Sequence, residues 1–230
     1  MPRGRAVSWH SRGLLLARGL PPAHGLLPVM DDRPGAGARR GGSLRRQEIF
    51  RIAADIFYRK GYAQTSTRDI AEAAGILKGS LYAHISSKED ILHAIVQDVH
   101  RLFESNVAAC EALDAPPLDR LRSFLAGHMR VALSELEYHQ VYTRDWRSLS
   151  DERCRAVRAQ RDEYERYLAA LLEEAQKAGQ VRADIDSRLL AMAILSALNA
   201  VHGWYRPGGE FPASTVADAY CSMVLDGVVI

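Results

Sequence analysis

One stretch decides the fold of this chain: TRDIAEAAGILKGSLYAHI, residues 67–85. Two short helices that cross at a steep angle need a small residue where they touch, and Ala71 supplies it. Gly75 supplies a residue that tolerates a positive φ at the turn between them. The spacing predicts a helix-turn-helix, whose apolar contacts come from Ile70, Ala74, Ile76 and Leu81.

Two serines predict where the neighbouring helices begin. Ser66 with Asp69 is an acidic variant of the capping box, and Ser86 with Glu89 is its standard form at the start of a further helix. These local signals agree with the helix-turn-helix spacing. The alternative is a plain αα-hairpin with no role in nucleic-acid binding.

The second helix of the motif carries side chains that suit DNA. Lys78 and Ser80 near its start are expected to reach base edges in the major groove, and Gly79 lets the backbone come close. Tyr82 and His84 offer hydrogen-bond donors to phosphate oxygens. The sequence thus predicts that this helix is the recognition helix.

Further phosphate contacts are predicted at two helix starts. Ser66, Thr67 and Arg68 stand at the start of the first helix of the motif, where free backbone N–H groups favour anions. Lys88 stands at the start of the helix that follows the motif. Each of these side chains alone could be an ordinary solvated residue, so the prediction depends on their clustering.

Helical periodicity extends on both sides of the motif. An apolar stripe predicts a helix from about residue 45 to Gly61, with Ile49, Ile52, Ala53, Ile56 and Phe57 on one face. Downstream, no stretch shows the sustained period-two alternation of a strand. The predicted fold class is all-α, with a three-helix DNA-binding domain at 45–92 and a larger helical effector-binding and dimerisation domain at 93–230.

Breaks in the larger domain predict its helices. Pro116-Pro117, residues 148–151, Gly179 and the loop at 207–209 interrupt the apolar stripes. The predicted helices therefore lie at about 118–137, 151–178, 186–205 and 213–228.

Residues 1–44 are predicted to be a disordered N-terminal extension. The segment is rich in glycine, proline and arginine and has no apolar periodicity. It therefore cannot bury enough surface to offset the entropy cost of ordering. Met30 is an alternative start, which would leave residues 1–29 untranslated.

Composition limits the class of protein. Basic and acidic residues nearly balance, at 30 and 28, so affinity for DNA must come from local placement of charge. The three cysteines form no C-x-x-C pair, which indicates reduced thiols. The longest apolar stretch, 189–201, is shorter than the ~20 residues that cross a bilayer. We expect a soluble, cytoplasmic protein that does not contact membranes.

Catalytic and metal-binding motifs are missing from the sequence. There is no G-x-S-x-G, H-E-x-x-H, phosphate loop or G-x-G-x-x-G, so we expect no enzyme, no catalytic residue and no cofactor. Cys154, His93 and His100 lack the spacing of metal ligands, so no metal site is predicted. A metal or redox sensor built from these three residues is the alternative.

Residues 45–92 carry a specific set of matches to a known family: Ala53, Phe57, Gly61, Tyr62, Thr65, Arg68 to Ala71, Ala74-Gly75, Gly79 to Tyr82, His84 and Ser87 to Glu89. On these residues the segment resembles the DNA-binding domain of the TetR family of regulators, with Ile85 where the family usually has Phe. The resemblance implies a homodimer on a palindromic double-stranded DNA operator, acting as a repressor that a small molecule releases.

Two C-terminal helices predict how the chain dimerises. The helix at 186–205 is apolar nearly all round, so it must be buried on several sides. The helix at 213–228 adds an apolar stripe, and the pair could form a four-helix interface with its copy. The alternative is that both helices belong to the core of the monomer.

A second similarity indicates the class of effector. The segments 204–209 and 142–149 are similar to the C-terminal domain of the cholesterol-catabolism repressors of actinobacteria, a branch that senses coenzyme A thioesters. Where those relatives carry an Arg and a Trp, this chain has Leu195 and Asn199, which argues against a steroid-derived thioester. The similarity implies an acyl-CoA or fatty-acid-like effector, although Arg206 with Pro207 also suits an ordinary helix C-terminus.

Polar and aromatic side chains on helices that should surround a cavity are the candidate effector-binding residues. They are His128, Tyr142, Arg144, Trp146, Arg147 and Asn199. The two arginines suit an anionic ligand, although single arginines are more often solvated or salt-bridged. The alternative for the whole C-terminal part is a module that only dimerises or binds a protein partner.

Overall fold

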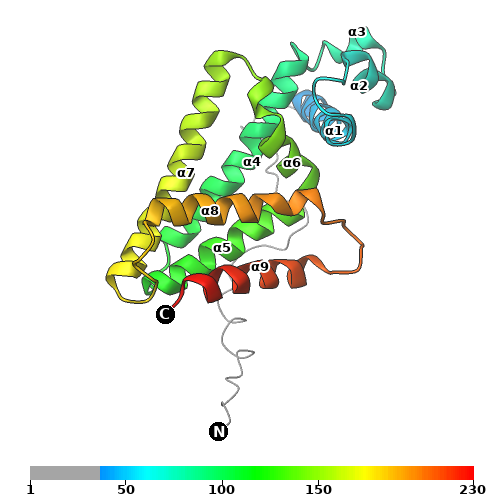
Figure 1. Cartoon of the computed structure of the whole chain (residues 1–230). Helices are drawn as coiled ribbons and strands as arrows, with labels where there is room; N and C mark the ends of the chain where they lie inside the picture. Colours follow the sequence, from blue (N-terminus) through cyan, green and yellow to red (C-terminus); the bar gives the residue numbers. More distant parts are fainter. Residues whose placement is uncertain (1–36) are drawn as a thin grey trace.

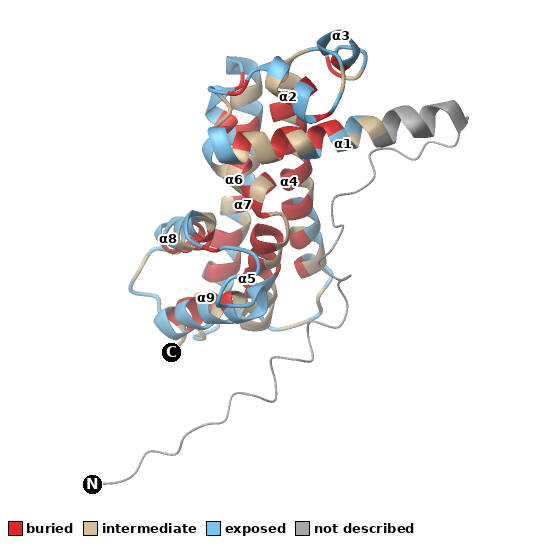
Figure 2. Ribbon diagram, turned by 90° about the vertical axis from the view of Figure 1, so that its right-hand side faces the viewer, coloured by how far each residue is buried: buried red, intermediate tan, exposed pale blue. Residues whose placement is uncertain are grey.

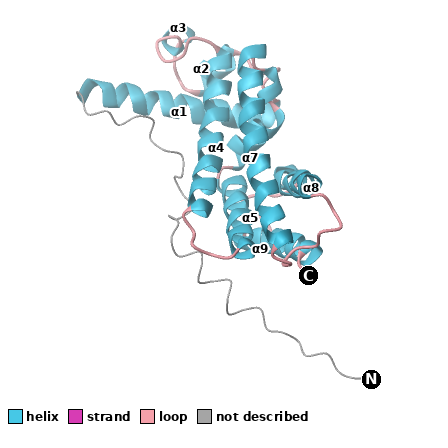
Figure 3. Ribbon diagram, turned by 90° about the vertical axis from the view of Figure 1, so that its left-hand side faces the viewer, coloured by secondary structure: helices cyan, strands magenta, loops and turns pink. Residues whose placement is uncertain are grey.

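The computed structural model describes the backbone of residues 37–230 and the side chains from Arg45 onward. The α-helices are α1 (Gly37–Lys60), α2 (Thr67–Ala73), α3 (Lys78–Leu81), α4 (Lys88–Glu111), α5 (Pro117–Ser134), α6 (Leu136–Arg144), α7 (Asp151–Lys177), α8 (Ser187–Asn199) and α9 (Ala213–Val228). Short 3-10 helices follow α6 (Trp146–Ser148) and α8 (Ala200–Gly203). The described residues contain no strand, and the predicted all-α fold is confirmed (Figure 3).

The helices form a small group at one end and a larger bundle at the other (Figure 1). Helices α1, α2 and α3 lie together, and α4 leads from them into the bundle, where it packs against α5, α6 and α7. Helix α8 packs on α7, and α9 packs on α5. Helix α6 is the part of the bundle that packs against α1, so the two groups meet along α4 and α6.

Buried apolar side chains run through the whole described chain as one cluster (Figure 2). At the small end, Phe57, Ile70 and Leu81 are fully buried, and in the bundle Phe103 and Phe124 are nearly or fully so. Ile91 and Ile95 of α4 are also fully buried and continue the core from one group to the other. Because the core is continuous and closely packed, a displacement of helices in the bundle can shift α1 to α3.

The start of α1 differs from the prediction. The helix begins at Gly37, which lies inside the segment predicted to be disordered up to residue 44. Once a helix exists, each added residue gains a hydrogen bond, so a helix can extend beyond its apolar stripe. Residues 1–36, including the alternative start Met30, lie outside the described part of the chain.

Two later boundaries also differ. The single helix predicted at 118–137 is two helices, because Glu135 has φ −125° and ψ 52° and interrupts the turn between α5 and α6. No proline or glycine marks this break, so it could not be predicted from the residues around it. The helix predicted to reach residue 205 ends at Asn199 and tightens into a 3-10 turn as far as Gly203. No described helix is long and apolar enough to cross a membrane.

Candidate DNA-binding surface and effector cavity

The helix-turn-helix has the local geometry that its sequence predicts. Ser66 Oγ accepts a hydrogen bond from the Asp69 N–H at 3.2 Å, and the Ser66 N–H donates to Asp69 Oδ2 at 2.8 Å, so the predicted capping box is present. These hydrogen bonds lower the pKa of the Asp69 carboxyl. Gly75 adopts φ 65° at the turn, a conformation that favours glycine, and Ile70 and Leu81 bury the inner faces.

The predicted DNA-contacting residues gather on one end of the molecule. Most are exposed, as contact with a ligand requires: Ser66, Arg68, Lys78, Gly79, Ser80 and Tyr82. Thr67 and His84 are half-buried. Thr67 Oγ1 and Tyr82 Oη lie 3.4 Å apart, so α2 and the end of α3 present these hydroxyls together.

Sequence reasoning missed one exposed side chain beside the recognition helix. Leu77 immediately precedes α3 and is 80% exposed. An apolar side chain at this position can contact the methyl group of thymine in the major groove. The signal was available, since Leu77 follows the partly buried Ile76 and falls outside the apolar stripe of the motif.

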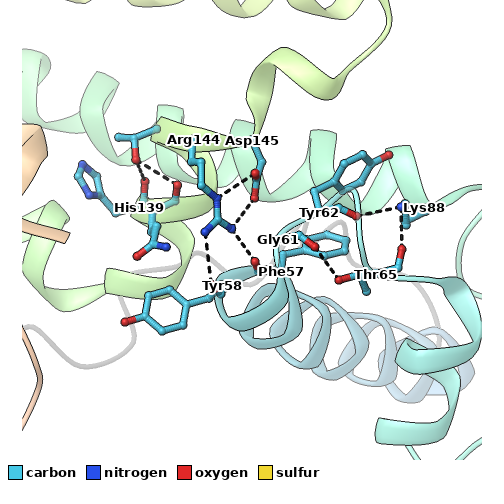
Figure 4. Close-up of polar contacts among 11 residues, drawn as sticks. Phe57, Tyr58, Gly61, Tyr62, Thr65, Lys88, His139, Arg144 and Asp145 are labelled. Carbon is cyan, nitrogen blue, oxygen red and sulfur yellow. Dashed lines mark hydrogen bonds and ion pairs between the residues drawn. The ribbon is translucent and has the colours of Figure 1, made fainter. Parts of the chain in front are cut away.

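Lys88 does not have the free ammonium group that the sequence interpretation gave it. Its Nζ donates to the carbonyl oxygens of Tyr62 at 2.9 Å and Thr65 at 2.7 Å, and lies 4.2 Å from the centre of the Tyr62 ring (Figure 4). Burial lowers the pKa of Lys88. In this arrangement the lysine holds the loop before α2 through two of its three N–H donors, and the direct phosphate contact stays a prediction.

The cap of α4 is also shifted by one residue from the prediction. Ser87, rather than Ser86, accepts the helix-capping hydrogen bond, from the Asp90 N–H at 3.0 Å. Glu89 instead accepts from the Ser150 N–H at 3.0 Å and pairs with Arg153 at 3.2 Å. Two adjacent serines each had an acidic residue at the right spacing, and packing against the start of α7 decided between them.

Arg144 lies at the junction of the two helix groups and not in a cavity. Its Nη2 donates to the Phe57 carbonyl at 2.6 Å and its Nη1 to the Tyr58 carbonyl at 3.4 Å, both at the C-terminal end of α1 (Figure 4). Asp145 pairs with the same guanidinium at 2.8 Å. The free carbonyls of a helix end are a natural partner for an arginine, so the effector-binding prediction for Arg144 is corrected to a structural link.

A cavity of about 200 Å³ lies between α4, α5, α6, α7 and α8 and is open to solvent on one side, where exposed residues such as Met192 and Ser196 line it. Three of the predicted effector residues line it: His128, Tyr142 and Asn199. Trp146 is buried outside the lining, and the exposed Arg147 stacks on it at 4.6 Å, so neither contributes a wall.

Sequence reasoning missed other walls of this cavity. Phe103 of α4 and Arg161 and Tyr164 of α7 also line it. Arg161 stacks on the rings of Tyr142 and Trp146, with its guanidinium carbon 4.8 and 5.6 Å from their centres. Neither residue could be assigned to a cavity from its pattern, because Tyr164 falls in an apolar core stripe and Arg161 is one of many charged residues on the same helix.

Buried polar groups form a chain of hydrogen bonds beside the cavity. Asn106 Nδ2 donates to the Phe124 carbonyl and to Tyr164 Oη, each at 3.1 Å, and Tyr164 Oη lies 3.2 Å from His128 Nδ1. His139 Nε2 lies 3.0 Å from Asn199 Oδ1. A buried network of this kind holds its members in fixed positions when it is satisfied.

The two buried histidines predict acid lability. Burial lowers the pKa of His128 and of His139 to about 3, so both stay neutral in the folded state, while in the unfolded chain they take up protons near pH 6.5. Their contribution to stability is complete above pH 6.5 and is lost as the pH falls towards 3. Burial raises the pKa of Asp98 to about 6, so between about pH 6 and 4 this carboxyl binds a proton in the folded state but not in the unfolded chain. That proton offsets one of the two that the histidines bind in the unfolded chain.

We therefore expect the free energy of unfolding to fall by roughly 1 kcal/mol per pH unit near pH 5. Urea titrations at pH 7, 6 and 5 measure this slope. The matched variant Asp98→Asn removes the offset and should steepen the slope. A free energy of unfolding that stays level from pH 7 to pH 5 would contradict the neutral state of the histidines.

A larger open groove, of about 550 Å³, lies between α1, α4 and the end of α3, and Arg46, His84 and Arg101 are among its lining residues. None of these lining residues has a buried polar atom without a partner. Within residues 45–230 no three metal-ligating side chains gather, and burial raises the pKa of the Cys110 and Cys221 thiols. Of these two hollows in the described part of the chain, the cavity in the bundle is the one lined by residues with unpaired buried polar atoms, His128 and Arg161.

Helices α8 and α9 expose apolar side chains along the side of the bundle. Leu189 and Met192 of α8 are 58% and 51% exposed, and Met223 of α9 is 58% exposed. Their inner faces are buried, as Leu198 and Val224 show. Large exposed apolar groups on two helices of one surface are typical of an interface between subunits.

Comparison with known proteins gives matches over both parts of the chain. Residues 49–95 match "Bacterial regulatory proteins, tetR family", and residues 114–228 match "Tetracyclin repressor-like, C-terminal domain". The HTH-type transcriptional repressor KstR2 of Rhodococcus jostii is 34% identical over 203 residues, which cover 85% of this chain and 96% of that protein.

Solved structures match the same span. The ketosteroid transcriptional regulator KstR2 of Mycobacterium tuberculosis superposes with a TM-score of 0.77 at 28% identity and covers 81% of this chain and 95% of its own. AibR in complex with isovaleryl coenzyme A and operator DNA superposes with a TM-score of 0.70 at 25% identity, over 78% of this chain and 97% of its own.

Proposed function

The chain belongs to the TetR family of bacterial regulatory proteins, and we propose that it is a homodimeric repressor that a small acyl ligand releases from a palindromic operator. As a member of this family it is a DNA-binding transcriptional regulator and not an enzyme. The observation that carries the proposal is the pairing of an exposed recognition helix with a cavity in the bundle behind it. The predicted cytoplasmic location is part of the proposal, because that is where a bacterial operator lies.

The DNA-binding part of the proposal assigns roles by position. Lys78 and Ser80 at the start of α3 are proposed to read base edges, while Arg68 and Tyr82 are proposed to contact phosphates. The division of the chain at residue 92 remains a prediction. Helix α4 runs across that point without a break, so it connects the DNA-binding helices to the bundle mechanically.

The dimer is proposed to form through α8 and α9. The exposed Leu189, Met192 and Met223 supply apolar area on both helices, and a two-fold axis would bury each against its copy. A dimer places two recognition helices on the same DNA face. They must lie about one helical turn apart, ~34 Å, to enter successive major grooves.

Release by an effector requires a route from the cavity to α3. Tyr142 lines the cavity on α6, and Arg144 of the same helix holds the end of α1. A ligand that moves α6 would therefore move α1. Because a ligand shifts only an equilibrium between states it binds unequally, the effector must prefer the arrangement that does not fit the operator. An acyl-CoA is proposed as the effector because AibR, one of the similar structures, holds isovaleryl coenzyme A.

The DNA-binding roles can be tested with genomic DNA that co-purifies with the protein and is then sequenced to obtain the operator. In titrations at several salt concentrations, Arg68→Gln should weaken binding to all sequences and reduce the slope of log affinity against log salt by about 0.9, the value for one lost phosphate contact. Lys78→Gln should instead change which base pairs are preferred.

The matched control is Arg166→Gln, since Arg166 is an exposed arginine on α7 in the bundle. It should leave the affinity, the slope and the base preference unchanged. If Arg68→Gln and Lys78→Gln both behave like this control, α2 and α3 are not the DNA-binding surface. The number of protein chains per operator, measured by light scattering, should be two.

A further inference from the structure

The unpaired atoms that line the cavity carry information about the ligand. His128 is 1% exposed, lines the cavity, and has no hydrogen-bond partner for its Nε2 within the described residues. Arg161 also lines the cavity, and its Nη1 is buried without a partner in the same part of the chain. A buried polar atom without a partner is costly, so a ligand that supplies the partner is favoured.

The hydrogen-bond network assigns the proton on His128. The Phe124 carbonyl can only accept a hydrogen bond, so the group of Asn106 that faces it must be the amide nitrogen, Nδ2. The same Nδ2 donates its second proton to Tyr164 Oη. The Tyr164 hydroxyl proton then needs an acceptor, and the nearest one is His128 Nδ1 at 3.2 Å. The neutral imidazole therefore carries its own proton on Nε2.

Both unpaired atoms are therefore donors. The His128 Nε2–H and the Arg161 guanidinium each need an acceptor, because an arginine side chain can donate hydrogen bonds but cannot accept them. Carbonyl and carboxylate oxygens are the acceptors that an organic ligand supplies most directly. A neutral amine has a single lone pair and could accept from only one of the two donors.

The size of the cavity limits the rest of the ligand. Its volume is about 200 Å³, below the ~300–1,000 Å³ of pockets that hold drug-sized molecules. A space of this size suits a short branched acyl chain, and any larger part of a ligand would lie outside the cavity, beyond its open side.

On the basis of the proposed function, we infer that the cavity binds a compact acyl group through its carbonyl or carboxylate oxygen, held by His128 Nε2–H and Arg161. The apolar lining residues Phe103 and Leu195 pack against the short hydrocarbon, and polar side chains line the rest of the cavity. The acyl group could arrive as a free acid or as a coenzyme A thioester, and both present the same acceptor oxygen.

The oxygen can be tested on the unmodified full-length protein by calorimetric titration. The probes are isovaleryl-CoA and its thioether analogue, S-isopentyl-CoA, which has a methylene in place of the carbonyl. We expect the thioester to bind at least about tenfold more tightly, because the thioether leaves the buried donors unpaired. Equal affinity for the two probes would overturn the inference.

Two further probes test the source and the size. Free isovalerate distinguishes an acid from a thioester, and tighter binding of either form supports the shared acceptor oxygen. Cholyl-CoA carries a four-ring acyl group, and tighter binding of this probe than of isovaleryl-CoA would overturn the compact-ligand inference. If no probe binds, the inference fails, whereas the proposed function fails only if the protein also does not bind its operator.

A variant pair locates the donor. His128→Phe keeps an aromatic ring to stack on Phe103, 4.8 Å away between ring centres, but removes the Nε2–H. In this variant the ratio of the affinity for the thioester to the affinity for the thioether should fall towards one. The control Arg166→Gln, outside the cavity, should keep the full preference. An unchanged preference in His128→Phe would remove His128 from the site.

Discussion

Replacement of Gly127 by alanine is expected to lower the free energy of unfolding by about 3 kcal/mol or more, from overpacking and broken buried hydrogen bonds together. A Cβ built at this position of α5 would lie 1.7 Å from Asn106 Oδ1 and 2.6 Å from its Cγ. Asn106 is 7% exposed and is held by the Phe124 carbonyl and by Tyr164, so it cannot move aside without losing both hydrogen bonds.

The same change should disturb the cavity, because Tyr164 also positions His128. Thermal and urea unfolding measure the loss of stability. The matched control is Gly203→Ala, in the exposed 3-10 turn after α8, where an added Cβ meets nothing within 4 Å. A Gly127→Ala protein that unfolds at the same urea concentration as the control would show that Asn106 can be displaced at little cost.

Replacement of Lys88 by methionine is expected to destabilise the DNA-binding end by about 2 kcal/mol, the range for hydrogen bonds that involve a charged group. The change removes both donations to the Tyr62 and Thr65 carbonyls while keeping the length of the side chain. The loop that these carbonyls belong to leads into α2 and its exposed Arg68, so operator affinity should fall as well.

The salt dependence separates this structural role from a direct phosphate contact. If Lys88 only fixes the loop, the slope of log affinity against log salt stays at the wild-type value in Lys88→Met. A slope reduced by about 0.9 would instead show that the lysine neutralises a phosphate. The control is Lys78→Met, an exposed lysine whose loss should leave the melting temperature unchanged while it alters DNA binding.

Local features of the DNA-binding end were predictable from the sequence. The capping box of Ser66 and Asp69, the turn at Gly75 and the buried Ile70 and Leu81 all depend on residues within about fifteen positions of one another. At each of these positions the residue type itself indicates the local structure, as glycine does where φ is positive. The fold class and the exposure of Lys78 followed from the same short-range patterns.

The cavity was predictable only in part. His128, Tyr142 and Asn199 were singled out as polar or aromatic residues on helices expected to surround a cavity, or from the similarity to related repressors, and they do line it. Arg161 was not, because a charged residue on a largely charged helix has the same pattern whether it faces solvent or a cavity. Only the packing of α7 against α8, α5 and α4 distinguishes the two.

Residues close together in the chain were enough to predict the helical class, the helix-turn-helix and the residues that it exposes. The partners of Lys88, Arg144 and Arg161 depend on how the helices pack, because a long cationic side chain has no preferred partner along the chain. It is held by whichever carbonyls or rings the fold brings within reach, here the backbone of Tyr62 and Thr65, the end of α1 and the aromatic walls of the cavity.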